Sequence, residues 1–273
     1  LKDIIKNYIR YTKAAKIKIK KPIVFSSFPI EKIDVSIIIP VYNQFKYTIQ
    51  CLNSIKQNTK DVNYEIIIID DCSTDETKNL EQFVKNVKII RNESNLGFLK
   101  NCNKAAKEAK GQYLYLLNND TVILKDTIKE LLNTFTEEKI GIAGSKMLSK
   151  NGVIQSAGAY IDNNGQSVSY GEYQLSDSPE YNTLKEVQYV SGASFMVRKH
   201  IWDKLGGFDE QFGLGYYEEA DFCRRTKLLG FKVIYQPKSE IIHFGNKTFS
   251  LNSEVIKLCE KNRKLYLDKW KNK

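Results

Sequence analysis

V-S-I-I-I-P, residues 35–40, is a short run of mostly β-branched side chains closed by a proline. A run of this kind is typical of a strand that is buried on both faces of a sheet. The next segment carries Ile49, Leu52 and Ile55 at helical spacing, and a second apolar run, E-I-I-I-I at residues 65–69, follows it. The sequence therefore predicts a buried strand, an amphipathic helix and a second buried strand.

Strands and helices continue to alternate over the next fifty residues. S-T-D-E at residues 73–76 has the capping residues of a helix start, and residues 98–109 have the pattern of a third helix. Residues 87–90 and 113–117 are expected to be the third and fourth strands. The alternation predicts an α/β fold with a mostly parallel, Rossmann-like sheet and helices on both faces. Ligands of such sheets bind beyond the carboxyl ends of the strands.

The second half of the chain has a different pattern, which begins after about residue 141. Residues 154–173 are rich in Gly, Asn, Ser and Tyr, and are expected to form loops and short antiparallel strands. We expect this half to be a smaller region packed on the first. Its strands are expected at residues 187–197 and 233–242, and its helices at 199–205 and 218–229.

Composition limits the class of protein. The 273 residues are 42% hydrophobic, which is enough to bury a core, and their formal net charge is +10. The lysines that carry this charge favour nucleic acid, anionic lipid or phosphorylated small molecules, although a solvated lysine-rich surface explains the charge equally well.

Cysteine usage and hydropathy indicate the setting of the protein. Five cysteines without paired C-x-x-C spacing favour neither a disulfide framework nor a zinc site, and they fit a reducing, cytoplasmic compartment. No run approaches the roughly 18 apolar residues of a membrane span.

Polar side chains follow the first two predicted strands. Pro40, Val41, Tyr42 and Asn43 place an aromatic ring and an amide where a flat base can be held. Asp70-Asp71 can accept hydrogen bonds from a base or from ribose hydroxyls. An acid in this loop can equally well cap the following helix.

The third strand leads into N-E-S-N-L-G-F, residues 92–98. Asn95 and Gly97 suit a turn, while Lys100 and Asn103 lie on the first turns of the next helix, where N–H groups and a cation favour phosphate. Neither G-x-x-x-x-G-K nor G-x-G-x-x-G occurs at these positions, which disfavours the P-loop and dinucleotide folds.

The fourth strand ends in Asn118, Asn119 and Asp120. One carboxylate beside two amides at the mouth of a sheet suits a hard cation, Mn²⁺ or Mg²⁺, that is shared with a diphosphate.

Two further clusters lie in the second half. Glu218, Glu219 and Asp221 begin a helix, where the macrodipole alone explains acidic residues. Crowding also raises carboxylate pKa values and produces a group that can take a proton from a hydroxyl. His243 ends a strand in a basic loop, although a lone histidine is more often a packed residue than a functional one.

Seven segments, taken in order, resemble glycosyltransferase family 2. They are V-S-I-I-I-P-V-Y-N, I-I-I-D-D-C-S-T-D, N-L-G-F, L-N-N-D-T, S-G-A-S-F-M-V-R, G-G-F-D-E and Y-Y-E-E-A-D-F-C-R-R. The resemblance runs from about residue 35 to residue 249. It implies a GT-A fold, a divalent cation, and inverting transfer of a sugar from a nucleotide-diphosphate donor, with UDP-sugar expected.

The resemblance also implies roles for single residues. Asp120 matches the last acid of the D-x-D metal motif, His243 matches a histidine that reaches the metal or diphosphate, and Glu219 stands where the family has its base. Two positions depart from the family pattern: Asn118 replaces the first acid of D-x-D, and Glu219 replaces an aspartate. The base is therefore left open among Glu219, Glu218 and Asp221. The residues expected to bind the nucleotide-sugar are Pro40, Val41, Tyr42, Asn43, Asp70, Asp71, Asn95, Gly97, Lys100, Asn103, Asn119 and Asp120.

The resemblance divides the chain into a basic leader (1–33), a nucleotide-sugar half (34–140), an acceptor and catalytic half (141–250) and a basic C-terminal helix (251–273). The acceptor is expected to be a glycan, glycoprotein or polysaccharide, with specificity set around residues 191–194 and 207–210. The expected location is cytoplasmic, and contact of the basic ends with the inner face of a membrane or with a partner protein stays open, as does a homo-oligomer.

Two other classes of function are alternatives to a glycosyltransferase. A sugar-phosphate nucleotidyltransferase uses a related sheet, but it has a glycine-rich basic loop after the first strand, unlike P-V-Y-N. A non-enzymatic basic module for nucleic acid lacks a recognition motif, so a nucleic acid partner is not expected.

Overall fold

The computed structural model describes residues 21–245 and 253–271. The amphipathic stretch at residues 4–9 and most of the predicted basic leader lie outside the described residues. The leader's last part forms β1 (Ile23–Val24), which pairs in parallel with β4 (Val84–Lys85).

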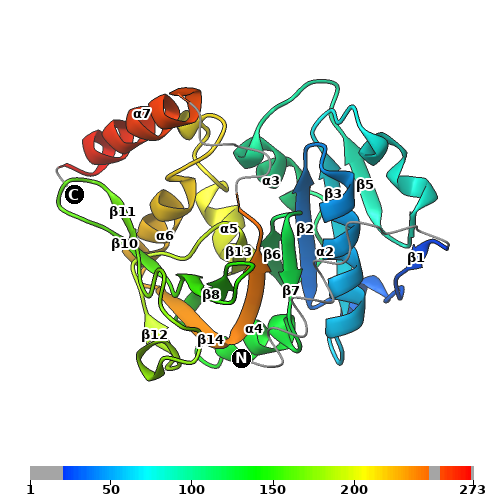
Figure 1. Cartoon of the computed structure of the whole chain (residues 1–273), viewed down its shortest axis with the longest axis horizontal. Coiled ribbons are helices and arrows are strands. Elements are labelled where there is room, and N and C mark those ends of the chain that lie inside the picture. The colour runs from blue at the N-terminus through cyan, green and yellow to red at the C-terminus, as the bar shows by residue number, and fades with distance from the viewer. Residues whose placement is uncertain (1–20, 246–252, 272–273) are drawn as a thin grey trace.

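A single ten-stranded mixed sheet forms the centre of the molecule (Figure 1). Its main path runs in the order β12-β14-β8-β13-β6-β2-β3-β5, with β7 paired to β14 and β9 paired to β8. The four strands predicted from the first half are present and mutually parallel. They are β2 (Val35–Val41), β3 (Tyr64–Asp70), β5 (Lys88–Arg91) and β6 (Tyr113–Leu117).

Helices cover both faces of this sheet, as predicted. On one face α2 (Phe45–Asn58) and α4 (Thr127–Thr134) pack in the core that contains Ile37 and Ile39. On the other face α3 (Phe98–Ala106), α5 (Lys199–Leu205) and α6 (Glu218–Leu228) pack in the core that contains Ile38. Successive residues of β2 therefore point to opposite layers, which explains why the whole run must be apolar.

Two helix predictions in the first half need correction. The segment after residue 76 is a 3-10 helix, η3 (Glu76–Gln82), which is interrupted by non-helical backbone at Asn79. Its start is capped by Asp75, whose side chain accepts a hydrogen bond from the N–H of Thr77. The third helix ends at Ala106, three residues earlier than predicted.

The second half extends the same sheet. β13 (Ser194–Arg198) lies antiparallel between β6 and β8 (Ile140–Leu148), and β14 (Lys232–His243) runs parallel to β8. The predicted strand at residues 187–197 was wrong over its first part, because residues 187–193 form a loop with a single isolated bridge at Tyr189.

The sequence analysis did not predict β8, because Gly144, Ser145 and Lys146 break its apolar pattern. All nine residues are nevertheless buried. The Lys146 Nζ donates to Ser176 O, Asn182 Oδ1 and Glu240 Oε1, which satisfies the buried cation.

The remaining elements are short apart from α7, and those at residues 154–169 are the antiparallel strands that the composition predicted. These elements are η2 (Ile30–Lys32), β7 (Thr121–Ile123), β9 (Ile154–Ser156), β10 (Ala159–Ile161), β11 (Ser167–Ser169), η4 (Pro179–Tyr181), β12 (Lys185–Glu186), η5 (Glu210–Phe212) and the long helix α7 (Ser253–Trp270). Among the helices of the described ranges, none is long and apolar enough to cross a membrane.

Gly144 allows a cavity-lining loop to approach the sheet. A Cβ added at this position would lie 2.4 Å from the Cβ of Val190, the residue that precedes the loop 191–193. Gly144→Ala should therefore lower the free energy of unfolding by about 1–3 kcal/mol, as overpacked cores do.

Urea unfolding of Gly144→Ala, Val190→Ala and the double variant measures this overpacking. Val190→Ala removes the side chain that clashes, so the double variant should be more stable than the sum of the two single losses predicts. Strict additivity would contradict the packing described.

Candidate active site

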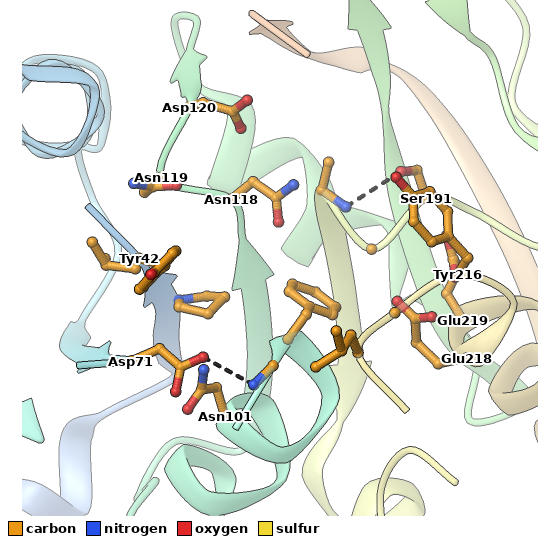
Figure 2. Close-up of a pocket in the computed structure, with 18 of the residues that line it drawn as sticks. Tyr42, Asp71, Asn101, Asn118, Asn119, Asp120, Ser191, Tyr216, Glu218 and Glu219 are labelled. Carbon is orange, nitrogen blue, oxygen red and sulfur yellow. Dashed lines mark hydrogen bonds between the residues drawn. The ribbon is translucent and has the colours of Figure 1, made fainter. Parts of the chain in front are cut away.

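A cavity of about 540 Å³ opens beyond the carboxyl ends of β2, β3 and β6, and the start of α6 forms its opposite wall (Figure 2). The structure brings most of the predicted site residues to this cavity. They are Pro40, Val41, Tyr42, Asp71, Asn95, Gly97, Asn119, Asp120, Glu218, Glu219 and His243.

Asp71 organises the base of the cavity. Its Oδ1 accepts hydrogen bonds from the N–H of Leu96 (2.8 Å) and from Asn92 Nδ2 (2.9 Å), and its Oδ2 accepts the N–H of Gly97 (2.9 Å). These three donors do not fill the roughly four acceptor sites of a carboxylate. Asp71 therefore holds the turn at Gly97 and can still accept a hydrogen bond from a bound molecule.

Asp120 and His243 face each other at another edge of the cavity. The carboxylate Oδ1 of Asp120 lies 3.3 Å from the Nε2 of His243, and Asp120 is only 5% exposed. The N–H of Phe244 donates to the carbonyl of Asp120 (3.0 Å), which ties the end of β14 to the turn after β6.

Gln155 fixes the tautomer of His243. Its Nε2 donates to the carbonyl of His243 (2.9 Å), so its Oε1 is the atom that faces His243 Nδ1 at 3.0 Å. An amide oxygen only accepts, so Nδ1 carries a proton, and Nε2 is the ring atom that faces Asp120.

This pair fits a hard divalent cation. Two adjacent ligands of an octahedral ion that are each about 2.1 Å from it lie about 3 Å apart, close to the Nε2–Oδ1 separation. No group of three or more His, Cys, Asp or Glu side chains able to hold a metal occurs within the described ranges. Oxygens of a bound diphosphate would have to complete the coordination.

Asn118 and Asn119 flank Asp120 in different ways. The Nδ2 of Asn119 donates to Thr48 Oγ1 (3.0 Å), so its amide anchors the turn to α2. The carbonyl of Asn118 accepts from Thr121 Oγ1 (2.6 Å), and its side chain lies between Asp120 and Ser191 in the cavity (Figure 2).

Glu218 and Glu219 form the acidic wall. Burial raises the pKa of Glu218 well above its ordinary value of 4.5, and the charge of Glu219 adds to the effect. Burial also raises the pKa of Glu219, while hydrogen bonds from the N–H groups of Glu219 and Gly192 act in the opposite direction. Both carboxyl groups are therefore harder to ionise than an ordinary glutamate.

One oxygen of each glutamate is free for a ligand. The Oε2 atoms of Glu218 and Glu219 are buried and have no hydrogen-bond partner among residues 21–245 and 253–271. A buried acceptor without a partner is costly, and a bound hydroxyl would satisfy it.

The loop 212–217 crosses from this wall to the nucleotide half. The carbonyl of Leu214 accepts the N–H of Phe98 (3.2 Å), and a Cβ added at Gly97 would lie 2.8 Å from the Leu214 side chain. Tyr216 and Tyr217 both have a φ of 73°, in the left-handed region. Each such residue costs of order 1 kcal/mol or more, so neighbouring contacts must hold the loop in place.

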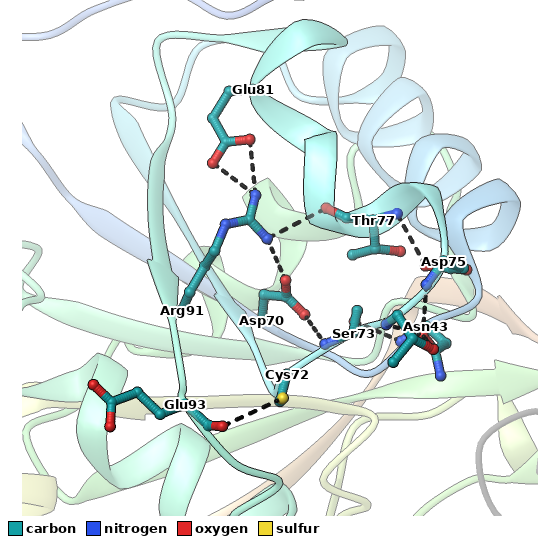
Figure 3. Close-up of polar contacts among 10 residues, drawn as sticks. Asn43, Asp70, Cys72, Ser73, Asp75, Thr77, Glu81, Arg91 and Glu93 are labelled. Carbon is teal, nitrogen blue, oxygen red and sulfur yellow. Dashed lines mark hydrogen bonds and ion pairs between the residues drawn. The ribbon is translucent and has the colours of Figure 1, made fainter.

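Two predicted nucleotide-binding residues lie outside the cavity and serve the loops around it (Figure 3). Asn43 Oδ1 accepts the N–H groups of Thr74 (2.8 Å) and Asp75 (3.2 Å), which joins the loop after β2 to the loop after β3. The buried carboxylate of Asp70 forms an ion pair with the partly exposed Arg91 and accepts the N–H of Ser73 (3.0 Å).

Three other predicted residues also lie outside the cavity. Lys100 is exposed on α3. Asn103 forms hydrogen bonds with both the N–H (2.8 Å) and the carbonyl (2.9 Å) of Phe208. Asp221 is fully buried, and its carboxylate pairs with Arg225 (2.7 Å) and Lys269 (2.7 Å). The carboxylate of Asp221 is therefore paired with two cations and does not line the cavity.

The residues around 191–194 and 207–210, where specificity was expected, separate in the structure. Ser191, Gly192 and Ala193 line the cavity, whereas residues 207–210 line a different, shallow hollow. The sequence analysis missed Phe98, Asn101, Leu214, Gly215 and Tyr216 as lining residues. Phe98 and Asn101 are one helical turn apart and follow the Gly97 turn, a spacing that could have indicated them.

Curated relatives match parts of the chain. It is 34% identical over 122 residues to the poly(ribitol-phosphate) beta-N-acetylglucosaminyltransferase TarS of Staphylococcus aureus, covering 43% of this chain and 21% of TarS. It is 25% identical over 220 residues to the O-antigen biosynthesis protein RfbC of Myxococcus xanthus, covering 77% of this chain and 17% of RfbC. The chain thus spans about a fifth of the length of these relatives.

Solved structures share the fold. GalNAc-T7 with UDP, GalNAc and Mn²⁺ superposes with a TM-score of 0.65 at 16% identity, covering 79% of this chain and 44% of that chain. TarS in complex with UDP-GlcNAc gives 0.51 at 22% identity, covering 78% of this chain and 56% of that chain. The architecture is the GT-A fold.

The family assignment rests on a longer match. Residues 36–206, which include β2, β6 and most of the cavity-lining turns, match the sequence profile of Glycosyl transferase family 2. With the strand-end residues gathered around one cavity, this match shows that the chain belongs to glycosyl transferase family 2.

Proposed function

We propose that this chain transfers a sugar, with inversion, from a nucleotide-diphosphate donor to a hydroxyl of a glycan, glycoprotein or polysaccharide. One observation carries the proposal: a single cavity has an Asp120–His243 pair at one edge and a wall of two buried glutamates. The Asp120–His243 pair can hold a cation that stabilises a departing diphosphate, and the glutamate wall can accept the proton of an attacking hydroxyl. UDP is the proposed nucleotide because the solved relatives with the same fold hold UDP and UDP-GlcNAc.

The nucleotide is proposed to bind along the ends of β2 and β3. The ring of Tyr42 is 37% exposed and can hold the face of a base, while Asp71 accepts hydrogen bonds from the base or ribose. The diphosphate then lies toward Asp120 and His243, which are proposed to hold a Mn²⁺ or Mg²⁺ ion. When bound, such an ion supplies charge stabilisation to the leaving group.

Glu219 is proposed to act as the base. As the acceptor oxygen bonds to the anomeric carbon, the bond from that carbon to the diphosphate oxygen breaks, and the hydroxyl proton passes to Glu219. A single displacement on the face opposite the leaving group inverts the anomeric centre. Glu218, whose pKa is raised by burial, can donate a hydrogen bond to the acceptor in its protonated form.

A screen of UDP-, GDP- and dTDP-sugars for Mn²⁺- or Mg²⁺-dependent release of the nucleoside diphosphate tests the proposal. The expected result is release of UDP together with transfer of the sugar to an acceptor hydroxyl or to water. Release of pyrophosphate would support nucleotidyl transfer instead. Tight RNA retention on a filter without turnover of any donor would support a basic binding module.

Glu219→Gln should lower kcat by about 10²–10⁴-fold, the usual contribution of a positioned base, and leave the Kd for UDP unchanged. Initial rates and UDP titration measure the two effects. Glu218→Gln is the matched control, because glutamine resembles a protonated glutamate, and it should keep kcat within about tenfold of wild type. The assignment is reversed if Glu218→Gln is the slower variant.

The pH dependence of kcat/KM should show the ionisation of Glu219. Its folded-state pKa is raised, so Glu219 takes up a proton, and stops acting as a base, at a higher pH than an ordinary glutamate does. The rate therefore rises with pH as Glu219 ionises. We expect an acidic limb centred above pH 4.5, measured at saturating cation. Glu219→Gln should lack this limb. A wild-type limb centred at or below 4.5 would contradict the environment described.

Asp120→Ala should abolish the increase in UDP affinity that Mn²⁺ produces, because it removes one of two protein ligands. Calorimetric titration with and without Mn²⁺ measures this increase directly, without turnover. Asp126→Ala, an aspartate outside the cavity, is the matched control and should retain it. An unchanged Mn²⁺ effect in Asp120→Ala would exclude the proposed metal site.

A further inference from the structure

The C-terminal helix α7 packs directly on the acidic helix α6 and the loop before it (Figure 1). The ring of Tyr266 lies 5.6 Å from that of Tyr217, and Trp270 Nε1 donates to the Asp221 carboxylate (3.1 Å). Lys269 pairs with the same carboxylate at 2.7 Å. α7 lies beyond the segment that matches the family profile, which ends at residue 206.

Asn262 of α7 binds the backbone of the loop 212–217. It is fully buried, and its Nδ2 donates to the carbonyls of Phe212 (2.7 Å), Gly215 (2.8 Å) and Tyr216 (3.1 Å). The two N–H groups of one side-chain amide therefore lie against three carbonyls of the loop, so at least one N–H is shared. Two of the three belong to residues that line the cavity.

The amide acts only as a donor. Its Oδ1 is buried and has no hydrogen-bond partner among the described residues. The opposite orientation of the amide would turn this oxygen toward three carbonyl oxygens, so the orientation is set by the loop. An unsatisfied buried acceptor is a cost that a leucine would avoid, which indicates that the donors are what this position supplies.

The loop that Asn262 holds is strained and carries the glutamate pair. Tyr216 and Tyr217 have left-handed backbone, and Glu218 and Glu219 follow them directly. On its other side the loop is tied to the nucleotide half through the bond from Phe98 N to Leu214 O. Loss of the Asn262 donors would allow residues 215–217 to relax and would shift Glu219 relative to the donor sugar.

We propose that Asn262 is a positioning residue for the base, so that α7 is a working part of the active site. The proposal rests on the proposed function of Glu219, and it goes beyond it by assigning a role to a helix outside the matched family segment. Asn262 touches no substrate. It acts through the backbone of residues 212–216.

Asn262→Leu, which keeps the size and removes the donors, tests the proposal. We expect kcat to fall about 100-fold, the effect of a misplacement of about 1 Å, while the KM for the donor stays within about threefold. Amide hydrogen exchange of residues 213–217 should become faster, with β2 and β3 unchanged. Where Asn262→Leu does not fold, Asn262→Ser keeps one short donor and should show the same changes with a smaller loss of kcat.

Gln236→Met is the matched control. Gln236 is also a buried amide, and it donates to Thr134 Oγ1 (2.9 Å) on α4, away from the cavity. The Gln236→Met variant should have a lower melting temperature, as Asn262→Leu should, while kcat and amide exchange of residues 213–217 stay near wild type. Equal losses of kcat in both variants, or a kcat within twofold of wild type in Asn262→Leu, would overturn the proposal.

The same experiment separates this proposal from the proposed function. If the wild-type protein turns over no donor, the proposed function fails, and hydrogen exchange still reports whether Asn262 holds the loop. If wild type is active and exchange in the loop is unchanged in Asn262→Leu, the positioning role alone fails.

Discussion

The parallel pairing of β2 with both β3 and β6 is the constraint on which the site depends. Parallel strands end at the same edge of a sheet, so the turns after three separate strands lie close together although they are far apart in the sequence. Tyr42, Asp71 and Asp120 meet at one cavity for this reason. The apolar side chains of these strands, buried on both faces, fix the register that makes the meeting possible.

Electrostatic differences around the cavity arise from packing. The carboxylate of Asp71 is held by three donors, whereas those of Glu218 and Glu219 each retain a buried oxygen without a partner in the described part of the chain. Burial favours the protonated form of Glu218 and Glu219. A carboxylate that is held by several donors is thus suited to binding, whereas a carboxyl group with an unpartnered oxygen is suited to proton transfer.

The sequence predicted the parallel half of the fold well, because the apolar runs at β2, β3 and β6 have few alternatives. β8 was not predicted, because a glycine and a lysine are unusual in a buried strand. Val190 packs closely against Gly144, and three acceptors satisfy the amine of Lys146. Such partners are distant in sequence and cannot be read from a local pattern.

The same limit applied to the candidate site. Glu219 and Asp221 stand two residues apart at one helix start, and no local rule separates them. In the structure Glu219 lines the cavity, while Asp221 is paired with Arg225 and Lys269. Asn43 and Asp70 likewise follow the predicted strands, yet their side chains bind neighbouring loops. The position of a residue at a strand end thus predicted the region of the site, but only the direction of its side chain shows whether it lines the cavity.

The continuity of the sheet across β13 limits how substrates can enter. β13 pairs with β6 through residues 194–198 and with β8 through residues 195–197, so one hydrogen-bonded ladder runs beneath both halves of the molecule. A hinge rotation that separated the halves would break this ladder. A change in the shape of the cavity on binding would therefore come from the loops above the sheet, and not from a hinge between the two halves.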